Sequence, residues 1–297
     1  MTSLDRLATE QPNPRTADLD LLETLGVLER INAEDQLVAV AVRAALPAVA
    51  RAVDLSLERW RRGGRVVLFG AGTSGRLALL DAAELPPTFG VPAGRYAAVM
   101  AGGSDAFLRA VEGAEDDRHA GRDAAAALQD SDVAFGIAAS GRTPWVIGAL
   151  ERARQLGALT IGLACVPAPE LADFVDVLIA VDTGPEAVSG STRMKAGTAQ
   201  KLVLNMFSTA LMVRLGKVYA NLMVDVQATN AKLRQRAVRL VEQATGADAN
   251  TAGAALNDAH GQVKVAIAAL RLGISAAEAG RRLSVAEGRL RVVLGES

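Results

Sequence analysis

The chain has 297 residues, half of them hydrophobic, and a formal net charge of −1. This length is sufficient for a large α/β domain and a smaller second one, and the balanced charge argues against nucleic acid or an acidic membrane surface as a partner. The first 16 residues lack the apolar segment of a signal peptide, and no uncharged apolar run reaches the ~18 residues of a membrane span. We therefore expect a cytoplasmic protein that spans no membrane.

Cysteine and histidine are scarce in this chain. Cys165 is the single cysteine, and His119 and His260 are the two histidines. These three residues are too few for the Cys/His sets that hold zinc and similar metals, so the sequence predicts no metal site of that kind. Cys165 lies in an apolar, strand-like run and is expected in the core, whereas both histidines are expected at the surface.

The N-terminal part is predicted to be helical after a polar start. Residues 1–17 contain two prolines and indicate an extended arm. Leucine and isoleucine recur at every third position over Asp18–Ile31, as on one face of a helix. A second helix is expected over Glu34–Arg62, with a kink at Pro47.

Five apolar runs then have the composition of buried parallel strands. They are Val66–Phe69, Tyr96–Met100, Val133–Ala138, Leu159–Ala164 and Val175–Val181. Helices are expected between and after them, over 77–83, 107–113, 118–128, 144–156 and 194–215. This alternation predicts an α/β fold with a five-stranded parallel sheet flanked by helices.

Turns rich in glycine and hydroxyl side chains follow three of these strands, with their hydroxyl groups at 73–74, 140–143 and 189–198. Ligands of such sheets bind beyond the carboxyl ends of the strands, and backbone N–H groups at a helix start bind anions. The turns therefore predict a site for an anionic or polyhydroxylated ligand. The first turn is not a Walker loop, and it is a weak dinucleotide fingerprint because no acidic residue ends a clean second strand.

The C-terminal part is predicted to be helical from Asp225 onward. A break is expected at 245–248, with short amphipathic helices over 250–256, 263–270 and 276–294. The expected organisation is an N-terminal arm with helices over 1–54, a central α/β domain over 55–218, and a small helical bundle over 219–297.

Several long strings resemble a single family. They include GAGTSGR, AVEGAEDD, IAASGRTP and SGSTRMKAGTAQK. The chain resembles the N-acetylmuramic acid 6-phosphate etherases of the sugar isomerase (SIS) superfamily over nearly its whole length, and its C-terminal part resembles a ubiquitin-associated bundle. The resemblance implies a SIS fold and a homodimer without metal or nucleotide cofactor. It also implies a sugar-phosphate substrate, N-acetylmuramate 6-phosphate, whose D-lactyl ether is cleaved to N-acetylglucosamine 6-phosphate and D-lactate.

The resemblance further implies the residues of the site. Glu84 and Glu115 fall on the family's two acidic positions. The implied substrate-binding residues are Gly72, Thr73, Ser74, Ser140, Gly141, Thr143, Ser191 and Lys195. Each acidic or basic group also has an ordinary interpretation: Glu84 as a carboxylate near a helix end, Glu115 as an N-cap, and Lys195 with Arg193 as a solvated helix start.

The chemistry suits two carboxyl groups. In the open-chain sugar, the C1 aldehyde acidifies the C2 proton, so a base can remove it while an acid protonates the departing lactate oxygen, and water then adds back. We assign Glu115 as the base and Glu84 as the acid, an order that the sequence does not fix. A non-catalytic sugar-phosphate sensor and an aldose–ketose isomerase remain alternatives, and release of D-lactate distinguishes them from an etherase.

Helix geometry adds a prediction about the dimer. If the first helix of the central domain begins at Ser74, Glu84 lies ten residues on, or about 15 Å along the axis. A hexose phosphate held at Ser140 would then not reach both ends of that helix in one subunit, which predicts that Glu84 comes from the partner subunit. The alternative is an early helix break that folds Glu84 back over its own pocket.

Overall fold

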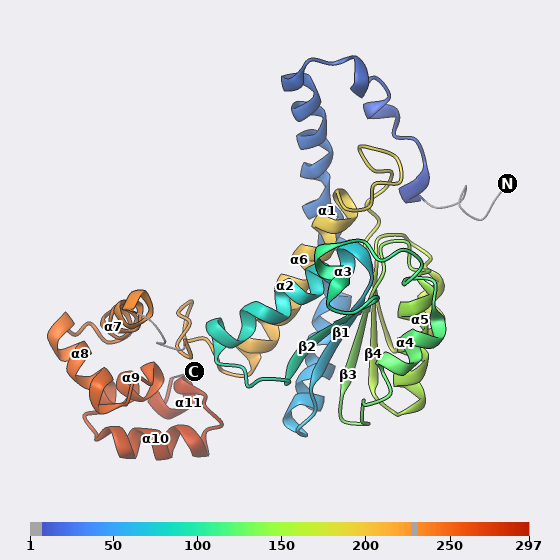
Figure 1. The fold of residues 1–297 in the computed structure, drawn as a ribbon. Coiled ribbons are helices and arrows are strands. Elements are labelled where there is room, and N and C mark those ends of the chain that lie inside the picture. The colour runs from blue at the N-terminus through green and yellow to red at the C-terminus, as the bar shows by residue number, and fades with distance from the viewer. Residues whose placement is uncertain (1–7, 227–230, 297) are drawn as a thin grey trace. The chain divides into compact units, whose positions relative to one another are not determined.

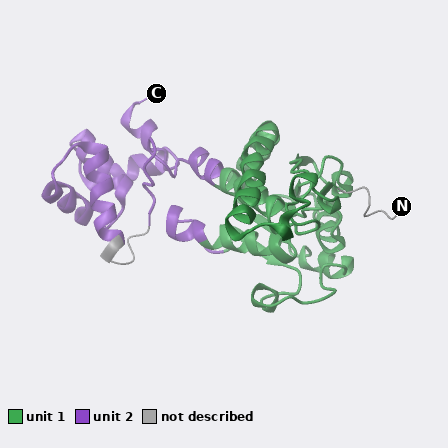
Figure 2. Ribbon diagram, turned by 90° about the horizontal axis from the view of Figure 1, so that it is seen from above, with its two compact units in different colours: residues 1–83, 94–208 green, residues 84–93, 209–297 purple. Residues whose placement is uncertain are grey.

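The structure is a computed structural model that describes residues 8–226 and 231–296. The chain divides into two compact units (Figure 2). The first unit contains residues 1–83 and 94–208, and the second contains residues 84–93 and 209–297. Each unit is described separately below. The three-part division expected from the sequence stays a prediction.

The first unit is built on a five-stranded parallel sheet with the order β2-β1-β3-β4-β5 (Figure 1). Its strands are β1 (Val66–Gly70), β2 (Tyr96–Met100), β3 (Val133–Ile137), β4 (Leu159–Ala164) and β5 (Val177–Ala180). Gly70, at the end of β1, pairs with Met100 on one side and Ile137 on the other. The predicted fold class is therefore confirmed, with each strand within two residues of its expected bounds.

Both faces of the sheet are covered, which explains why its strands read as continuous apolar runs. On one face, Phe69 of β1 packs against Trp145 of α5 (Pro144–Gln155), with ring centroids 6.1 Å apart. Elsewhere in the core, Phe135 of β3 meets Phe207 of α6 (Lys195–Arg214) edge-on at 4.9 Å. Cys165 is buried in this core, as the sequence predicts.

The N-terminal helices differ from the prediction. Short 3-10 turns cover Ala8–Glu10, Pro14–Thr16 and Leu19–Leu21, and α1 then runs unbroken over Thr24–Arg61 with Pro47 inside it. Two helices were expected, with a boundary at Asn32–Ala33. That boundary is absent because neither residue breaks a helix: alanine is the best helix former, and a single asparagine costs well under 1 kcal/mol.

Among the described residues, α1 is also the one helix that is long and apolar enough to cross a membrane by length and composition. This is weak evidence, because a helix that packs on a soluble core passes the same test. Here α1 packs against β4 and β5.

The helix after β1 is longer than expected. α2 extends over Gly72–Phe89, whereas the sequence predicted 77–83 followed by a rigid connection. Pro86 and Pro87 lie in its last turn. Each proline removes an N–H donor and crowds the carbonyl four residues earlier, which normally kinks or ends a helix, yet α2 continues through the pair to Phe89.

Two other helices of the first unit are shorter than predicted or displaced. α3 covers Asp105–Leu108 and α4 covers Arg118–Ala124, and a 3-10 segment, η5, covers Glu170–Phe174. Asp117 caps α4 by accepting a hydrogen bond from the N–H of Ala120 at 2.9 Å.

The second unit contains a helical bundle with its own apolar core. Its helices are α7 (Ala231–Thr245), α8 (Ala249–Asp258), α9 (Val263–Leu272), α10 (Ala276–Val285) and α11 (Leu290–Leu294). The break at 245–248 is confirmed, and Asp248 caps α8. The single helix expected over 276–294 is wrong, because Glu287 and Gly288 have φ angles of 53° and 74° and cannot continue a right-handed helix.

Candidate functional site

The sheet order places the candidate site between β1 and β3. β1 connects through α2 to β2 on one side, while β3, β4 and β5 continue on the other. In sheets of this order, ligands bind at the carboxyl ends of the two strands where the direction of winding reverses. Thr73 and Ser74 follow β1, and Ser140 and Thr143 follow β3. The structure therefore brings these two predicted turns to the same edge, and the third turn meets the first, since a Cβ atom at Gly197 would lie 3.5 Å from Thr73 Cγ2.

The first turn depends on the close approach of α2 to the end of β1. A Cβ atom at Gly75 would lie 2.8 Å from the carbonyl oxygen of Gly70, so a side chain here would push the helix away. Gly72 has a φ of 53°, in the left-handed region that glycine adopts without strain. These contacts place the first turn of α2, with Thr73 and Ser74, directly over the strand.

Ser74 is buried, and its hydroxyl donates to Oε1 of Gln200 on α6 at 3.0 Å. The Nε2 atom of Gln200 is also buried and has no hydrogen-bond partner among the described residues. A buried donor of this kind is costly unless a water molecule or a ligand accepts from it. The base of the first turn thus offers a donor that the described protein groups leave unused.

The second turn leads into α5. Ser140 Oγ accepts from the N–H of Arg142 at 3.4 Å, and Gly141 has a φ of 69°. Thr143 is the N-cap of α5, with Pro144 at the first helical position as predicted, but its side chain makes no capping hydrogen bond. The Thr143 hydroxyl is therefore available at the positive end of a 12-residue helix, the arrangement that binds phosphate groups in many proteins.

Glu115 is held beside this second turn. Its carbonyl oxygen accepts from the N–H of Trp145 at 3.0 Å, two residues after Thr143. The tether is possible because α4 packs closely on α5: a Cβ atom at Gly121 would lie 1.9 Å from the carbonyl oxygen of Trp145. The Glu115 side chain is exposed. The capping interpretation of Glu115 is wrong, because Asp117 performs that role.

Glu84 lies on α2, ten residues after Ser74, and is exposed. Because α2 continues to Phe89, the alternative in which an early break folds Glu84 back is wrong. Glu84 belongs to the second compact unit and Glu115 to the first. Their joint action therefore stays a proposal.

Lys195 is neither solvated nor at an open surface. Its side chain is 1% exposed, and its Nζ donates to Glu34 Oε2 at 2.7 Å. Arg15 and Asn13 donate to the same carboxylate. Hydrogen bonds from Arg15 first, and then from Lys195 and Asn13, lower the pKa of Glu34 to about 2. Arg193 is exposed, as a solvated residue at the helix start would be.

A second buried carboxylate holds the start of α6. Glu186 is fully buried and accepts from the N–H groups of Lys195 at 2.8 Å and Ala196 at 3.0 Å. Burial raises its pKa, while those two N–H groups oppose the shift. Sequence analysis missed both Glu34 and Glu186.

The third hydroxyl-rich turn, which contains Ser191, is tied to the N-terminal segment. The N–H of Gly190 donates to the carbonyl of Thr9 at 3.1 Å, and the Thr16 hydroxyl donates to the carbonyl of Ala187 at 2.8 Å. The polar N-terminal residues thus order this turn. Over residues 8–226 and 231–296, no group of three or more His, Cys, Asp or Glu side chains could hold a metal ion.

The fold and these turns define a SIS domain. A model of the SIS domain matches residues 107–210, and a model of the glucokinase regulatory protein N-terminal SIS domain matches residues 48–154. More specifically, the chain belongs to the family of N-acetylmuramic acid 6-phosphate etherases. It is 52% identical to the protein of that name from Enterobacter sp. (strain 638), over 98% of this chain and 99% of the relative. It is 55% identical to that from Symbiobacterium thermophilum, over 90% and 89%.

A solved structure with a similar fold is the putative phosphosugar isomerase involved in capsule formation from Bacteroides fragilis. It is 21% identical to this chain, with a TM-score of 0.49, and the match covers 65% of this chain and 94% of that one.

Proposed function

We propose that the chain cleaves the D-lactyl ether of N-acetylmuramate 6-phosphate, yielding N-acetylglucosamine 6-phosphate and D-lactate. The observation that carries the proposal is the identity of 52% to a curated etherase over 98% of the chain. The site supports it, since two hydroxyl-rich turns and an exposed carboxylate lie at the same edge of the sheet. The reaction would serve the catabolism of cell-wall amino sugars in the cytoplasm, and it requires no metal or nucleotide cofactor.

The phosphate group binds at the second turn in this proposal. The hydroxyls of Ser140 and Thr143 and the backbone of Gly141 face the positive end of α5, which favours a dianion. Thr73 and Ser74, with Gly72, bind sugar hydroxyls at the first turn, where the free amide donor of Gln200 adds a hydrogen bond.

Ser191 and Lys195 complete the substrate-binding set. Because Lys195 already forms an ion pair with Glu34, its contribution is to hold the third turn in place and to add positive potential through the wall of the site, rather than to act as a free cation.

Elimination of lactate uses the two glutamates. Glu115, tethered beside the phosphate turn, removes the C2 proton of the open-chain aldehyde. Glu84 donates a proton to the ether oxygen as the C3–O bond breaks, and water then adds to the unsaturated aldehyde at C3. Each carboxyl ends the cycle in its starting protonation state after the addition of water, so two groups are sufficient.

The continuous helix α2 supports a composite site in a homodimer. With about 15 Å of helix between Ser74 and Glu84, one hexose phosphate does not reach both ends. Glu84 of one subunit would therefore complete the site that contains Glu115 of the other. No nucleic acid or membrane takes part.

A direct assay tests the proposed function. The purified protein is incubated with N-acetylmuramate 6-phosphate, and D-lactate is measured with a stereospecific dehydrogenase. We expect stoichiometric release of D-lactate. Saturable binding of the sugar phosphate without release would instead favour a sensor, the alternative supported by the match to the glucokinase regulatory protein SIS domain.

A further inference from the structure

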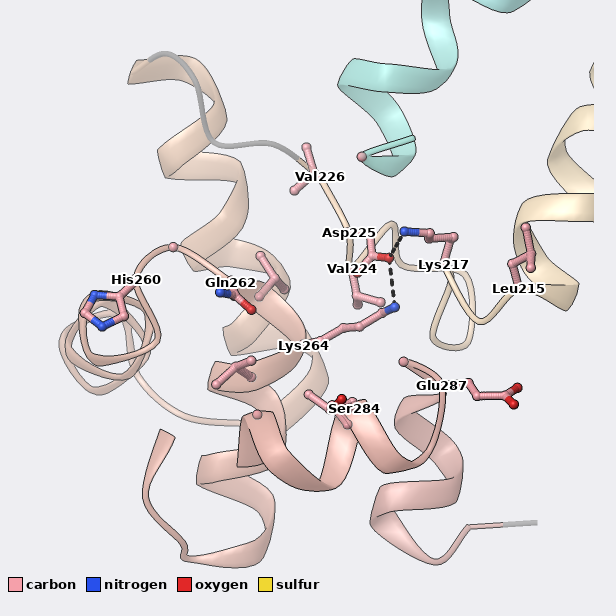
Figure 3. A pocket seen from close by; sticks show the side chains of 17 residues that line it. Leu215, Lys217, Val224, Asp225, Val226, His260, Gln262, Lys264, Ser284 and Glu287 are labelled. Atoms are coloured by element: carbon pink, nitrogen blue, oxygen red, sulfur yellow. Dashed lines mark hydrogen bonds and ion pairs between the residues drawn. The ribbon is translucent and has the colours of Figure 1, made fainter. Parts of the chain in front are cut away.

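The second unit contains a cavity of about 660 Å³ that the proposed reaction does not use (Figure 3). The start of α9, the chain that follows α6, and the second half of α10 with the turn after it form its walls. Polar lining side chains come from all three segments. They are Lys217, Asp225, His260, Gln262, Lys264, Ser284 and Glu287.

Two lysines in this cavity share one carboxylate oxygen. Nζ of Lys217 and Nζ of Lys264 each lie 2.8 Å from Asp225 Oδ2. The three side chains are 25%, 10% and 19% exposed, in the order Lys217, Lys264 and Asp225. Among the described residues, two ammonium groups on one carboxylate leave one positive charge without a counter-ion in a largely buried place, which is costly.

The surplus positive charge affects the pKa of Lys264. Burial is the main cause that lowers the pKa of its ammonium group, and the charge of Lys217 lowers it further, whereas Asp225 opposes both effects. An anion in the cavity would relieve the repulsion between the two lysines.

The start of α9 adds to the positive potential. The first intrahelical bond of α9 runs from the N–H of Ala266 to the carbonyl of Gln262. By helix geometry, the N–H groups of residues 263–265 have no intrahelical acceptor, and all three residues line the cavity. The Gln262 side chain makes no capping hydrogen bond to them. Two ammonium groups and a helix N-terminus therefore meet in one cavity.

The remaining acidic residue of the cavity does not neutralise this charge. The side chain of Glu287 is 66% exposed and forms an ion pair with Arg289 at 3.8 Å. In Figure 3 its carboxylate points away from the lysines. Gly288 lies against Lys264, since a Cβ atom at this position would be 3.4 Å from the ammonium nitrogen.

We propose that this cavity is a binding site for a small carboxylate anion. A carboxylate matches the single surplus positive charge, whereas a phosphate dianion would exceed it. The Ser284 hydroxyl and the Gln262 amide provide neutral hydrogen-bonding partners. The competing interpretation is a purely structural ion-pair cluster that attaches residues 217–225 to α9.

Methyl NMR spectroscopy tests the proposal, because valine and leucine methyl groups line the cavity. The full-length protein, labelled in these methyls, is titrated with sodium acetate against sodium chloride at equal ionic strength, without any sugar phosphate. We expect acetate-specific shifts at Val263 and Leu283 that saturate with a Kd of roughly 1–10 mM. Absence of saturable shifts at these residues overturns the proposal.

Charge-removing variants locate the site. Lys264→Gln and Lys217→Gln should each weaken acetate binding by at least about tenfold, and each leaves Asp225 paired with the other lysine, so folding is retained. Arg282→Gln, which removes an exposed positive charge of α10 outside the cavity, is the matched control and should bind acetate like the unmodified protein.

Two further results would overturn the proposal. One is equal weakening in the control variant, because binding would then follow net charge rather than the cavity. The other is inorganic phosphate that binds tenfold more tightly than acetate at pH 7, because the ligand class would then be wrong. These binding measurements involve no turnover, so their result is independent of the result of the D-lactate assay.

Discussion

Replacement of Glu34 by glutamine should destabilise the first unit strongly. The change keeps the side-chain shape but removes the charge that pairs with Lys195, which is 1% exposed. Removing one partner of a buried ion pair costs about 3–5 kcal/mol, because the other charge stays buried without compensation. Arg15 is half-exposed, so the loss of its bond contributes less.

The pKa of Glu34 measures the combined effect of its hydrogen bonds from Arg15, Lys195 and Asn13, with Arg15 as the largest contributor. A folded-state value of about 2 against an ordinary 4.5 corresponds to about 3 kcal/mol at 1.36 kcal/mol per pKa unit. Because the folded-state pKa is lowered, this stabilisation is present above about pH 4.5 and is lost as the pH falls toward 2. In Glu34→Gln, this part of the acid dependence should disappear.

Urea unfolding followed by tryptophan fluorescence measures both effects. Both tryptophans, Trp60 and Trp145, lie in the first unit, so their emission reports on the unit that contains Glu34. The control is the double variant Glu34→Leu/Lys195→Met, which removes both charges and should recover to within about 1 kcal/mol of the unmodified protein. A loss below 1 kcal/mol in Glu34→Gln, or no recovery in the double variant, would refute the reasoning.

The remaining predictions concern the proposed site. Glu84→Gln and Glu115→Gln should each lower D-lactate release by at least ~100-fold, with an unchanged unfolding midpoint because both side chains are exposed; near-normal release would remove that carboxylate from the mechanism. In deuterated water, loss of the base should abolish exchange at C2, and loss of the acid should leave some, so the reverse result would exchange the two roles. Mixing these two inactive variants under subunit exchange should restore activity towards half the unmodified level, after allowance for residual homodimers; no recovery means that each site draws both carboxylates from one chain. Gly141→Ala should raise the KM for the sugar phosphate and cost at least ~1 kcal/mol, since φ is 69° and the new Cβ would lie 2.1 Å from Pro169 Cβ. Its control, Gly253→Ala, adds a methyl group with no atom within 4 Å inside a helix and should be neutral or stabilising; equal KM values in both variants would contradict the assignment of the phosphate turn.

Local sequence patterns were sufficient to predict the parallel sheet and the edge of the sheet at which the ligand-binding turns lie. A buried parallel strand requires an apolar run that ends in a turn, and all five runs had this form. The start of α5 was also predictable, because Pro144 suits the first helical position and follows a residue that caps the helix. Since parallel strands end at one edge, the positions of Thr73 and Ser140 near each other followed from the alternation of elements alone.

Helix ends were less predictable, because they depend on context beyond the local pattern. Asn32–Ala33 resembled a boundary, yet α1 passes through it. Pro86 and Pro87 suggested an early end to α2, because proline beyond the first turn disfavours a helix, but α2 continues to Phe89. At 287–288 the sequence pattern indicated one continuous amphipathic helix, but the structure has two. Glu287 and Gly288 both have positive φ angles, in the left-handed region, and they separate α10 from α11.

The sequence by itself determined the fold class, the edge of the sheet where the ligand turns gather, and the family to which the chain belongs. Only the tertiary structure decided which charged groups are paired. Lys195 and Glu34 are 161 positions apart, and Lys264 shares Asp225 with Lys217 across a cavity wall. Strand and helix patterns repeat over two to four residues and are visible locally. The partner of a buried charge is selected by the folded packing around it, so no local pattern reveals it.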